Sequence, residues 1–318
     1  RACQRLVHSG MAVLMYDTII IGAGAAGMMC AAQQTGRCLL IDHAKTEGEK
    51  IRISGGGRCN FTNMYAGPEN YISQNPHFVK SALSRYTQWD FIDLVTRHKI
   101  AWHEKTLGQL FCDGSAKQII AMLLTEIERA GAALWLQTSV KEVRKTDAGY
   151  TVEVDREGAH HVLHCRNLVL ATGGKSIPKM GATGLAYDIA TKFGLRLTKT
   201  RPALVPLTFP DGRFSDLSGV SLPVRLSNTS AEFDEALLFT HRGLSGPAVL
   251  QLSSYWREGE EIIANLIPDV PLLAALRAQR QSEGRRQLTT ELSRHLPARL
   301  VQYLSDHLPL SGRLADQS

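Results

Sequence analysis

Three glycines in the pattern Gly-x-Gly-x-x-Gly could bind the pyrophosphate of a dinucleotide. Gly22 permits a tight turn, Gly24 lets the backbone approach a phosphate, and Gly27 lets a helix pack closely on a strand. The first N–H groups of that helix would bind the anion. Asp42 lies twenty residues after Gly22, where such a site places a carboxylate that hydrogen-bonds ribose hydroxyls. Because a carboxylate disfavours a 2′-phosphate, the pattern favours NAD or FAD over NADP.

A second glycine-rich segment follows, with the sequence Ser54-Gly55-Gly56-Gly57-Arg58-Cys59-Asn60. Three consecutive glycines are typical of neither a helix nor a strand. As a loop, the segment could turn backbone N–H groups and the Arg58 guanidinium toward a planar or anionic ligand. The alternative is a flexible surface loop that binds nothing.

The segments around the first glycines predict a Rossmann-like α/β fold with a parallel sheet. A buried strand at 18–21 leads into the glycines, a helix follows at 28–34, and a second buried strand spans 37–41. Asn75 and Pro76 predict the start of a helical segment that reaches Val95.

The next part of the chain predicts a second helix and then a β-meander. The helix spans 116–130, and alternating runs follow at 133–137, 140–145 and 150–154, with a partner strand that begins near His160. A further buried strand closes this part, and it ends in Ala171-Thr172-Gly173-Gly174.

Four segments together resemble the HI0933-like flavoprotein family, whose members are often described as NAD(P)/FAD-dependent oxidoreductases or BaiN-type proteins. The segments are 20–27, 54–63, 171–174 and 239–247, the last reading Phe-Thr-His-Arg-Gly-Leu-Ser-Gly-Pro. The resemblance extends from Met15 onward and implies an FAD-binding domain that is interrupted by an inserted domain. It also implies that FAD is lined by Gly22, Gly24, Ala25, Ala26, Gly27, Asp42, Ser54, Gly55, Gly56, Gly57, Arg58, Cys59, Asn60, Val140, Ala171, Thr172, Gly173 and Gly174.

If FAD is bound here, two of these residues are candidates for a role in catalysis. Arg58 would tune the flavin electrostatically, and Asn60 would hydrogen-bond to it. No residue is predicted to act as acid or base. One departure from the family is visible, because relatives tend to have glycine before the tyrosine that matches Tyr187, where this chain has Ala186.

The second half of the chain predicts a β-rich module at 205–265 and amphipathic helices after Pro271. The expected domains are therefore an extra leader at 1–14, an FAD-binding domain at 15–204 and an inserted domain at 205–318. No strand–glycine–acid segment that would return the chain to the flavin is found in 271–318. The resemblance thus predicts that the closing segment of the FAD domain is absent.

The composition of the chain limits which partners and which cell compartment we expect for it. The 318 residues carry 36 Lys and Arg against 30 Asp and Glu, and this net charge of +6 is too diffuse to predict a nucleic-acid partner. Six scattered cysteines without a Cys-x-x-Cys pair predict reduced thiols in a cytoplasmic protein. No apolar run is long enough for a membrane span. His160, His161 and His164 crowd one strand, but neighbours on a strand point to opposite faces, so we expect no metal site.

The leading hypothesis is an FAD-dependent oxidoreductase that passes hydride through the flavin from NADH or NADPH to a small organic acceptor. Thiol redox chemistry is not expected, because Cys59 has no cysteine near it in the sequence. One alternative is an NAD-only dehydrogenase, against which the meander and the triple glycine argue. The other is a shortened nucleotide-binding remnant without catalysis. The sequence specifies neither the substrate nor the oligomeric state.

Overall fold

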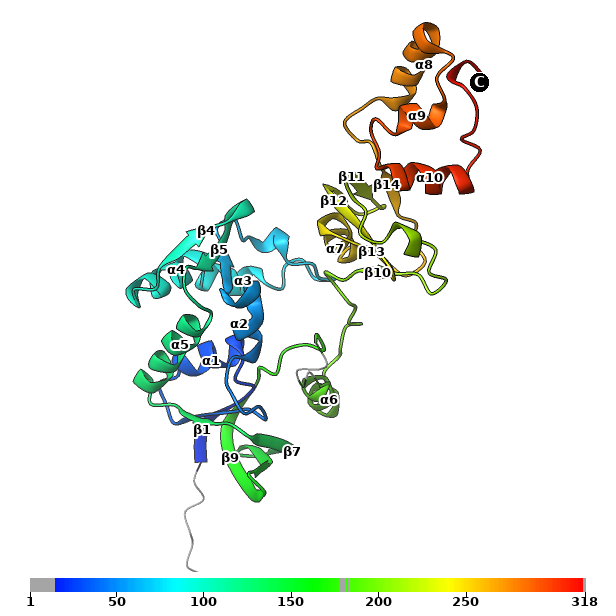
Figure 1. The fold of residues 1–318 in the computed structure, drawn as a ribbon. Helices are drawn as coiled ribbons and strands as arrows, with labels where there is room; N and C mark the ends of the chain where they lie inside the picture. Colours follow the sequence, from blue (N-terminus) through cyan, green and yellow to red (C-terminus); the bar gives the residue numbers. More distant parts are fainter. Residues whose placement is uncertain (1–14, 178–180, 182, 317–318) are drawn as a thin grey trace, which may run out of the picture. The chain divides into compact units, whose positions relative to one another are not determined.

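The computed structural model describes residues 15–177, 181 and 183–316, so the leader expected at 1–14 lies outside the described residues. The chain divides into two compact units, residues 1–198 and 199–318 (Figure 1). The sequence places the domain boundary a few residues later, between 204 and 205. In the described part of the chain, no helix is both long and apolar enough to cross a membrane.

Unit 1 contains a six-stranded sheet with the strand order β6-β2-β1-β9-β8-β7. The neighbours β6, β2, β1 and β9 pair in parallel, whereas β9, β8 and β7 pair antiparallel. This sheet confirms the predicted Rossmann-like α/β class. The strand bounds are β1 Met15–Ile21, β2 Cys38–Ile41, β6 Ala133–Trp135, β7 Thr138–Thr146, β8 Gly149–Arg156 and β9 Ala159–Leu170.

Strand β9 corrects the sequence prediction. The partner strand expected from His160 and the separate buried strand expected before Ala171 are one twelve-residue strand. Its first half pairs with β8, for example Tyr150 opposite Cys165, and its second half pairs with β1 as far as Leu170. No glycine or proline interrupts this stretch, so the strand continues from the meander into the parallel sheet. Strand β6, expected with the meander, pairs instead with β2 on the parallel side.

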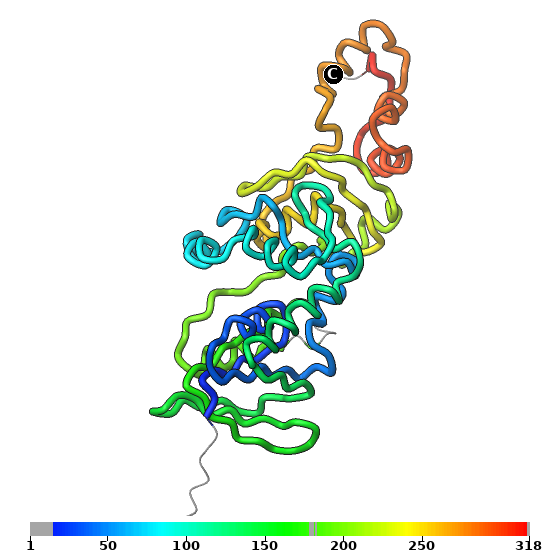
Figure 2. The backbone as a smooth tube through the Cα atoms, turned by 90° about the vertical axis from the view of Figure 1, so that its left-hand side faces the viewer, coloured from blue at the N-terminus to red at the C-terminus, as the bar shows by residue number. Residues whose placement is uncertain are grey.

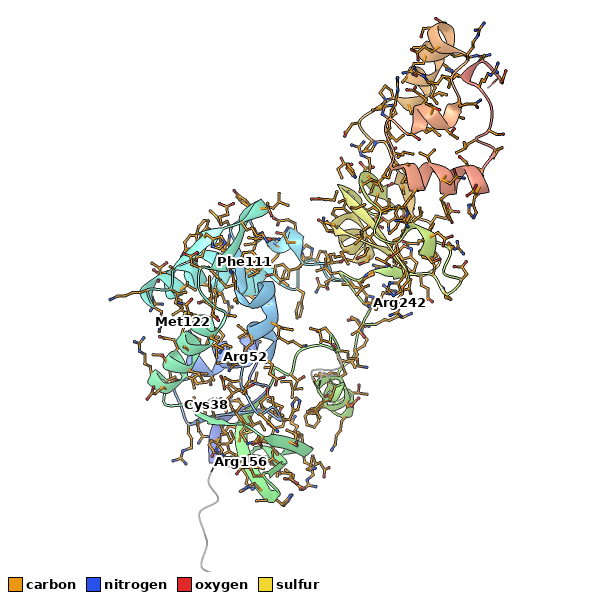
Figure 3. All side chains as sticks on the ribbon, viewed as in Figure 1. Cys38, Arg52, Phe111, Met122, Arg156 and Arg242 are labelled. Atoms are coloured by element: carbon orange, nitrogen blue, oxygen red, sulfur yellow. The ribbon has the colours of Figure 1, made fainter. Side chains whose placement is uncertain are left out.

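Helices α1 and α5 pack on one face of this sheet and α6 on the other, whereas α3 buries no residue. Successive side chains along the central strands point to opposite faces of the sheet, and because these side chains are apolar, both faces are apolar. Ile20 and Leu40 pack with α1 and α5, in a cluster that includes Cys38 and Met122, which Figure 3 labels. The backbones of α1 and α5 lie side by side (Figure 2). Ile19 and Leu39 lie in the cluster on the other face, together with meander residues and α6. The bounds are α1 Ala25–Ala32, α2 Glu49–Ile53, α3 Lys80–Arg85, α4 Gln88–Arg97, α5 Lys117–Arg129 and α6 Leu185–Lys192.

A small sheet with the order β3-β5-β4 lies between α2 and α5 in the chain. The segment expected as a loop at 54–63 is a helical turn over Ser54–Gly57, followed by a strand. The single helical segment expected up to Val95 is two helices, because Thr87 begins α4. Its hydroxyl accepts from the Asp90 N–H at 3.3 Å, and the Asp90 carboxylate accepts from the Thr87 N–H at 2.7 Å. The strand bounds are β3 Asn60–Asn63, β4 Trp102–Glu104 and β5 Gln109–Cys112.

Unit 2 begins with the β-rich part that the sequence predicts. Its five-stranded sheet has the order β10-β13-β12-β11-β14 and is antiparallel throughout. Buried leucines of the sheet share one core with α7, α9 and α10. The bounds are β10 Leu207–Thr208, β11 Ser221–Ser227, β12 Glu232–Thr240, β13 Gly243–Ser245, α7 Pro247–Ser253, β14 Ile263–Asn265, α8 Leu272–Glu283, α9 Leu288–Leu292 and α10 Ala298–His307.

Candidate functional site

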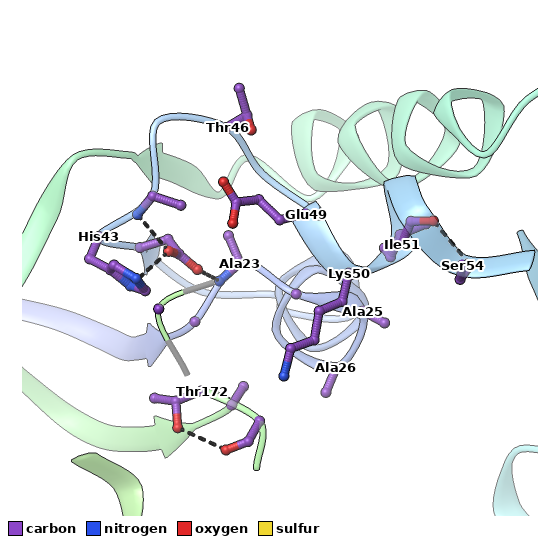
Figure 4. Close-up of a pocket in the computed structure, with 18 of the residues that line it drawn as sticks. Ala23, Ala25, Ala26, His43, Thr46, Glu49, Lys50, Ile51, Ser54 and Thr172 are labelled. Atoms are coloured by element: carbon purple, nitrogen blue, oxygen red, sulfur yellow. Dashed lines mark hydrogen bonds and ion pairs between the residues drawn. The ribbon is translucent and has the colours of Figure 1, made fainter. Parts of the chain in front are cut away.

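A cavity of about 710 Å³ lies where β1, β2 and β9 end at their carboxyl ends (Figure 4). Ligands of open α/β sheets bind at this edge, outside the carboxyl ends of the strands. The cavity is lined by Gly22, Ala23, Gly24, Ala25, Ala26, Asp42, His43, Ala44, Thr46, Gly48, Glu49, Lys50, Ile51, Ser54, Cys59, Asn60, Phe61, Phe91, Leu170, Ala171, Thr172, Gly173, Gly181 and Ala186.

The glycine turn between β1 and α1 has the geometry that the sequence predicts. Gly22 has φ +110°, and a Cβ on it would lie 2.5 Å from the Ala171 carbonyl oxygen. A Cβ on Gly27 would lie 1.8 Å from the Gly22 carbonyl oxygen, so α1 packs directly on the turn. A Cβ on Gly24 would meet nothing within 4 Å. Gly22 and Gly27 therefore shape the turn, whereas Gly24 leaves the space beside it open.

The N-terminus of α1 faces this cavity through Ala25 and Ala26. The first N–H groups of a helix have no acceptor inside the helix. The N-cap residue Gly24 has no side chain to cap them, and no acidic residue lies in the first turn. The first turn of α1 can therefore donate hydrogen bonds to an anion in the cavity.

Asp42 lies at the end of β2 and is fixed against the glycine turn. Its carboxylate accepts hydrogen bonds from the Ala23 N–H at 2.6 Å and the Ala44 N–H at 2.8 Å. His43 Nδ1 lies 3.3 Å from the same group, and the Asp42 side chain is 14% exposed. Two oxygens with several lone pairs remain able to accept further hydrogen bonds from a ligand hydroxyl.

Lys50 is a cavity residue that the sequence analysis missed (Figure 4). It lies on α2, which begins after Gly48 in the left-handed conformation at φ +64°. The Lys50 ammonium donates to the Ser176 hydroxyl at 3.0 Å, which joins α2 to the segment after β9. Among the described lining residues, Lys50 carries the permanent positive charge, and Asp42 and Glu49 carry carboxylates. The signal in the sequence for this helix start was the glycine at position 48, because a positive φ favours glycine.

The triple-glycine segment contributes only part of what was predicted. Ser54, Cys59 and Asn60 line the cavity, whereas Gly55, Gly56, Gly57 and Arg58 do not. The glycines instead form a turn with φ between +57° and +86°. That turn is held by the Ala116 N–H, which donates to the Gly57 carbonyl at 2.8 Å, and by the Cys112 N–H, which donates to the Arg58 carbonyl at 3.0 Å. The Arg58 side chain is exposed to solvent.

Cys59 has a neighbouring thiol that sequence distance concealed. Strands β3 and β5 are antiparallel, with Asn60 opposite Phe111. The residue before Asn60, Cys59, therefore lies opposite the residue after Phe111, which is Cys112. Burial raises the pKa of the Cys59 thiol, an effect that a hydrogen bond with Ser54 opposes. Burial, together with the nearby Cys59, raises the pKa of Cys112 to about 11. Both groups are therefore protonated and weakly nucleophilic at neutral pH.

The remaining predicted residues lie at the end of β9 and on the meander. Ala171, Thr172 and Gly173 line the main cavity, whereas Gly174 does not. Val140 of β7 lines a smaller adjoining cavity of about 60 Å³, which also touches Gly22, Asp42 and Thr172. Ala186, the departure from the family pattern, lines the main cavity at the start of α6.

These features are those of a Rossmann fold, in which strand, glycine turn, helix N-terminus and acid are in the expected order. The chain belongs to the HI0933-like protein family, because residues 16–292 match its Rossmann domain. This match confirms the family that the sequence motifs indicated.

Curated relatives refine the comparison. The chain is 52% identical over 296 residues to a protein of Escherichia coli (strain K12) named ribosomal RNA dihydrouridine synthase, covering 91% of this chain and 73% of the relative. It is 46% identical over 292 residues to a protein of the same name from Haemophilus influenzae, and the match covers 90% of this chain and 73% of the relative. It is 25% identical over 252 residues to a 3-dehydro-bile acid delta(4,6)-reductase of Clostridium scindens, and the match covers 76% of this chain and 60% of the relative.

Proposed function

We propose that this chain binds FAD in the cavity at the ends of β1, β2 and β9 and reduces uridine in ribosomal RNA to dihydrouridine. The observation that carries the substrate class is the identity of 52% and 46% with two relatives named for that reaction. The proposal departs from the small organic acceptor and the absence of a nucleic-acid partner that the sequence led us to expect.

The residues of the cavity fit a dinucleotide. The volume of about 710 Å³ lies within the range of ~300–1,000 Å³ typical of ligand sites. The open space beside Gly24 admits a phosphate, and the first turn of α1 would donate hydrogen bonds to it. Lys50 would supply a balancing positive charge. Asp42, held in place by two backbone N–H groups, would accept hydrogen bonds from ribose hydroxyls.

FAD in this cavity supplies hydride-transfer chemistry. In the net reaction, the C5=C6 double bond of a uracil gains a hydride and a proton while NADH or NADPH is oxidised to NAD⁺ or NADP⁺. The chain's own residues bind and orient: Asn60 lines the cavity and would hydrogen-bond to the flavin. With its amide nitrogen facing the Thr62 and Leu110 carbonyls, at 3.1 and 3.3 Å, the amide oxygen is free to accept. Arg58 lies outside the lining and is assigned no contact.

Two measurements test the proposal. Titration of the purified chain with FAD should give saturable binding with a perturbed flavin absorption spectrum. Incubation of the loaded protein with NADPH and unmodified ribosomal RNA, followed by nucleoside mass spectrometry, should reveal dihydrouridine. Binding of FAD without any dihydrouridine under either nicotinamide donor would overturn the substrate assignment, and an absence of FAD binding would overturn the whole proposal.

A second candidate is the reduction of a small conjugated ketone. The 25% identity with a bile-acid reductase supports it, as does the small organic acceptor expected from the sequence. The discriminating measurement is NADPH oxidation by the loaded protein with a steroid enone or with ribosomal RNA as acceptor. Turnover with the enone alone would favour this second candidate.

A further inference from the structure

The arginines at the end of unit 2 are concentrated in one helical segment, which we call the arginine segment, Leu272–Asp316. Its 45 residues contain seven arginines and no lysine, against four Asp and Glu residues. This net charge of +3 is half of the +6 of the whole chain. The arginine segment therefore contributes a substantial share of the positive charge of the chain.

Three of the seven arginines are neutralised or held in place. Arg286 and Arg294 contact the buried carboxylate of Glu291 at 3.0 and 3.3 Å, and Arg286 also pairs with Glu283. Arg299 donates to the Ser218 carbonyl at 3.2 Å and also to the Asp216 carbonyl. These side chains stabilise the fold of unit 2.

The other four arginines are exposed, and none has a side-chain partner among the described residues: Arg277, Arg280, Arg285 and Arg313. Arg277 and Arg280 are three residues apart on α8, so they lie on neighbouring parts of its exposed surface. Glu283, the acid on the same helix, is already paired with Arg286. The α8 surface therefore carries uncompensated positive charge.

Backbone contacts bring the segments that carry the remaining two arginines, Arg285 and Arg313, alongside each other beyond the end of α8. The Leu314 N–H donates to the Arg286 carbonyl at 2.8 Å, and the Ala315 N–H donates to the Gly284 carbonyl at 2.9 Å. The C-terminal residues consequently return beside α8 (Figure 1). This pairing sets Arg313 opposite Gln287, two residues after Arg285, and the nearby acid, Asp316, accepts from the Arg313 backbone N–H at 3.2 Å.

Unit 1 also has exposed arginines. Some are paired with acids, as Arg97 is with Asp93 at 3.0 Å and Arg166 with Asp17 at 3.0 Å. Others, such as Arg85 and Arg196, have no acidic partner among the described residues. Guanidinium groups without an acidic partner are suited to binding phosphates, because their planar fork of donors matches two phosphate oxygens.

We propose that the arginine segment binds the phosphate backbone of the RNA substrate through Arg277, Arg280, Arg285 and Arg313. The inference rests on the proposed function for the class of its ligand, and it assigns to unit 2 a binding role separate from the cavity in unit 1. Phosphate contacts position a nucleic acid without reading its bases, so the sequence of the RNA would have little effect on this contact.

The test uses the full chain and a fluorescein-labelled oligouridylate of about 20 nucleotides, whose binding is followed by anisotropy over a range of salt concentrations. Each phosphate contact with single-stranded RNA contributes about −0.7 to the slope of log affinity against log salt. The triple variant R277Q/R280Q/R285Q should therefore lose about 2 from the magnitude of the slope and about 100-fold in affinity near 0.1 M salt. The variant R277K/R280K/R285K should retain most of the binding.

The matched control is K117Q/K141Q/K145Q, which removes the same charge from exposed positions of α5 and β7. It should lose less than about threefold in affinity. Equal losses in both triple variants, or no loss in the arginine variant, would overturn the proposal. So would wild-type protein that binds anionic phosphatidylglycerol vesicles but not the oligouridylate. Unfolding midpoints of all variants report whether they remain folded.

Dihydrouridine formation is measured separately, so that the two proposals fail in different ways. Arginine-dependent RNA binding without dihydrouridine would retain the surface and reject the proposed reaction. Dihydrouridine formation with unchanged binding in the arginine variant would retain the reaction and reject the surface.

Discussion

The carboxylate of Asp42 accepts a hydrogen bond from the Ala23 N–H at 2.6 Å, and this contact joins the end of β2 to the turn that precedes α1. Replacing Asp42 with alanine removes both this bond and the proposed ribose contact. A hydrogen bond to a charged group contributes about 1.5–3 kcal/mol, so D42A should bind FAD ~10- to 100-fold more weakly. Fluorescence titration with FAD measures the change.

Asp17 provides the control for that measurement. Its carboxylate also accepts a backbone N–H, from Arg37 at 2.9 Å, but it lies outside the lining of the cavity. D17A should retain FAD affinity within about threefold, because it removes the same charge-assisted bond elsewhere. A comparable loss in D17A and D42A would mean that Asp42 acts through stability alone.

The two glycines of the turn should respond differently to an added methyl group. G27A forces a Cβ to within 1.8 Å of the Gly22 carbonyl oxygen, so it should lower the free energy of unfolding by about 1–3 kcal/mol or more. G24A meets nothing within 4 Å and should unfold like the wild type, while its methyl group obstructs the phosphate and weakens FAD binding. Chemical denaturation and FAD titration separate the two effects. Unchanged FAD binding in G24A would contradict the placement of the phosphate.

Lys50 should contribute charge to the bound cofactor. K50M should weaken FAD binding about tenfold and make it less sensitive to salt, because a cation near the pyrophosphate is lost. Lys45 is exposed and lies outside the cavity lining, so K45M is the matched control and should behave like the wild type. If K50M retains the salt dependence of wild-type binding, the ammonium serves only to hold Ser176.

The buried cysteines predict a loss of stability at high pH. Burial raises the pKa of Cys38, Cys112 and Cys165 to about 11. An unfolded thiol ionises near pH 8.5, so the folded state holds more protons than the unfolded state between those values. The stabilisation is complete below about pH 8.5 and is lost as the pH rises toward 11, by at most about 1.4 kcal/mol per pH unit for each thiol.

Urea denaturation under reducing conditions at several alkaline pH values measures this effect. The variant C38A/C112A/C165A should show a shallower decline of the free energy of unfolding than the wild type. Parallel declines would mean that other groups, such as tyrosines and lysines, cause the alkaline loss.

The features that could be predicted from the sequence are those set by local geometry. Gly22 and Gly27 are required by contacts within a few residues along the chain or with the adjacent strand end, and the strand–turn–helix order around them appears directly in the sequence. The acid at Asp42 follows from the same order. The parallel sheet, the family and the turn at the first glycines were therefore predicted correctly.

The features that escaped prediction depend on contacts between distant segments. Cys112 lies beside Cys59 only because β3 pairs with β5, a pairing with no sequence signature. Lys50 reaches the cavity because α2 begins after Gly48, and short helices have weak patterns. Arg58 is adjacent to lining residues in sequence, but consecutive residues of a turn point in different directions, so its side chain lies outside the cavity.

Strand β9 runs without a break from the hairpin turn at Glu157 and Gly158 to the cavity residue Ala171. Twelve extended residues span about 40 Å at ~3.3 Å per residue, so this hairpin is the far end of the strand that forms the cavity wall. A dye, affinity tag or surface linker placed at the hairpin would therefore be attached to the same strand as the cavity wall, about 40 Å from the cavity. It offers an attachment point for immobilising the protein while ligand binding is recorded.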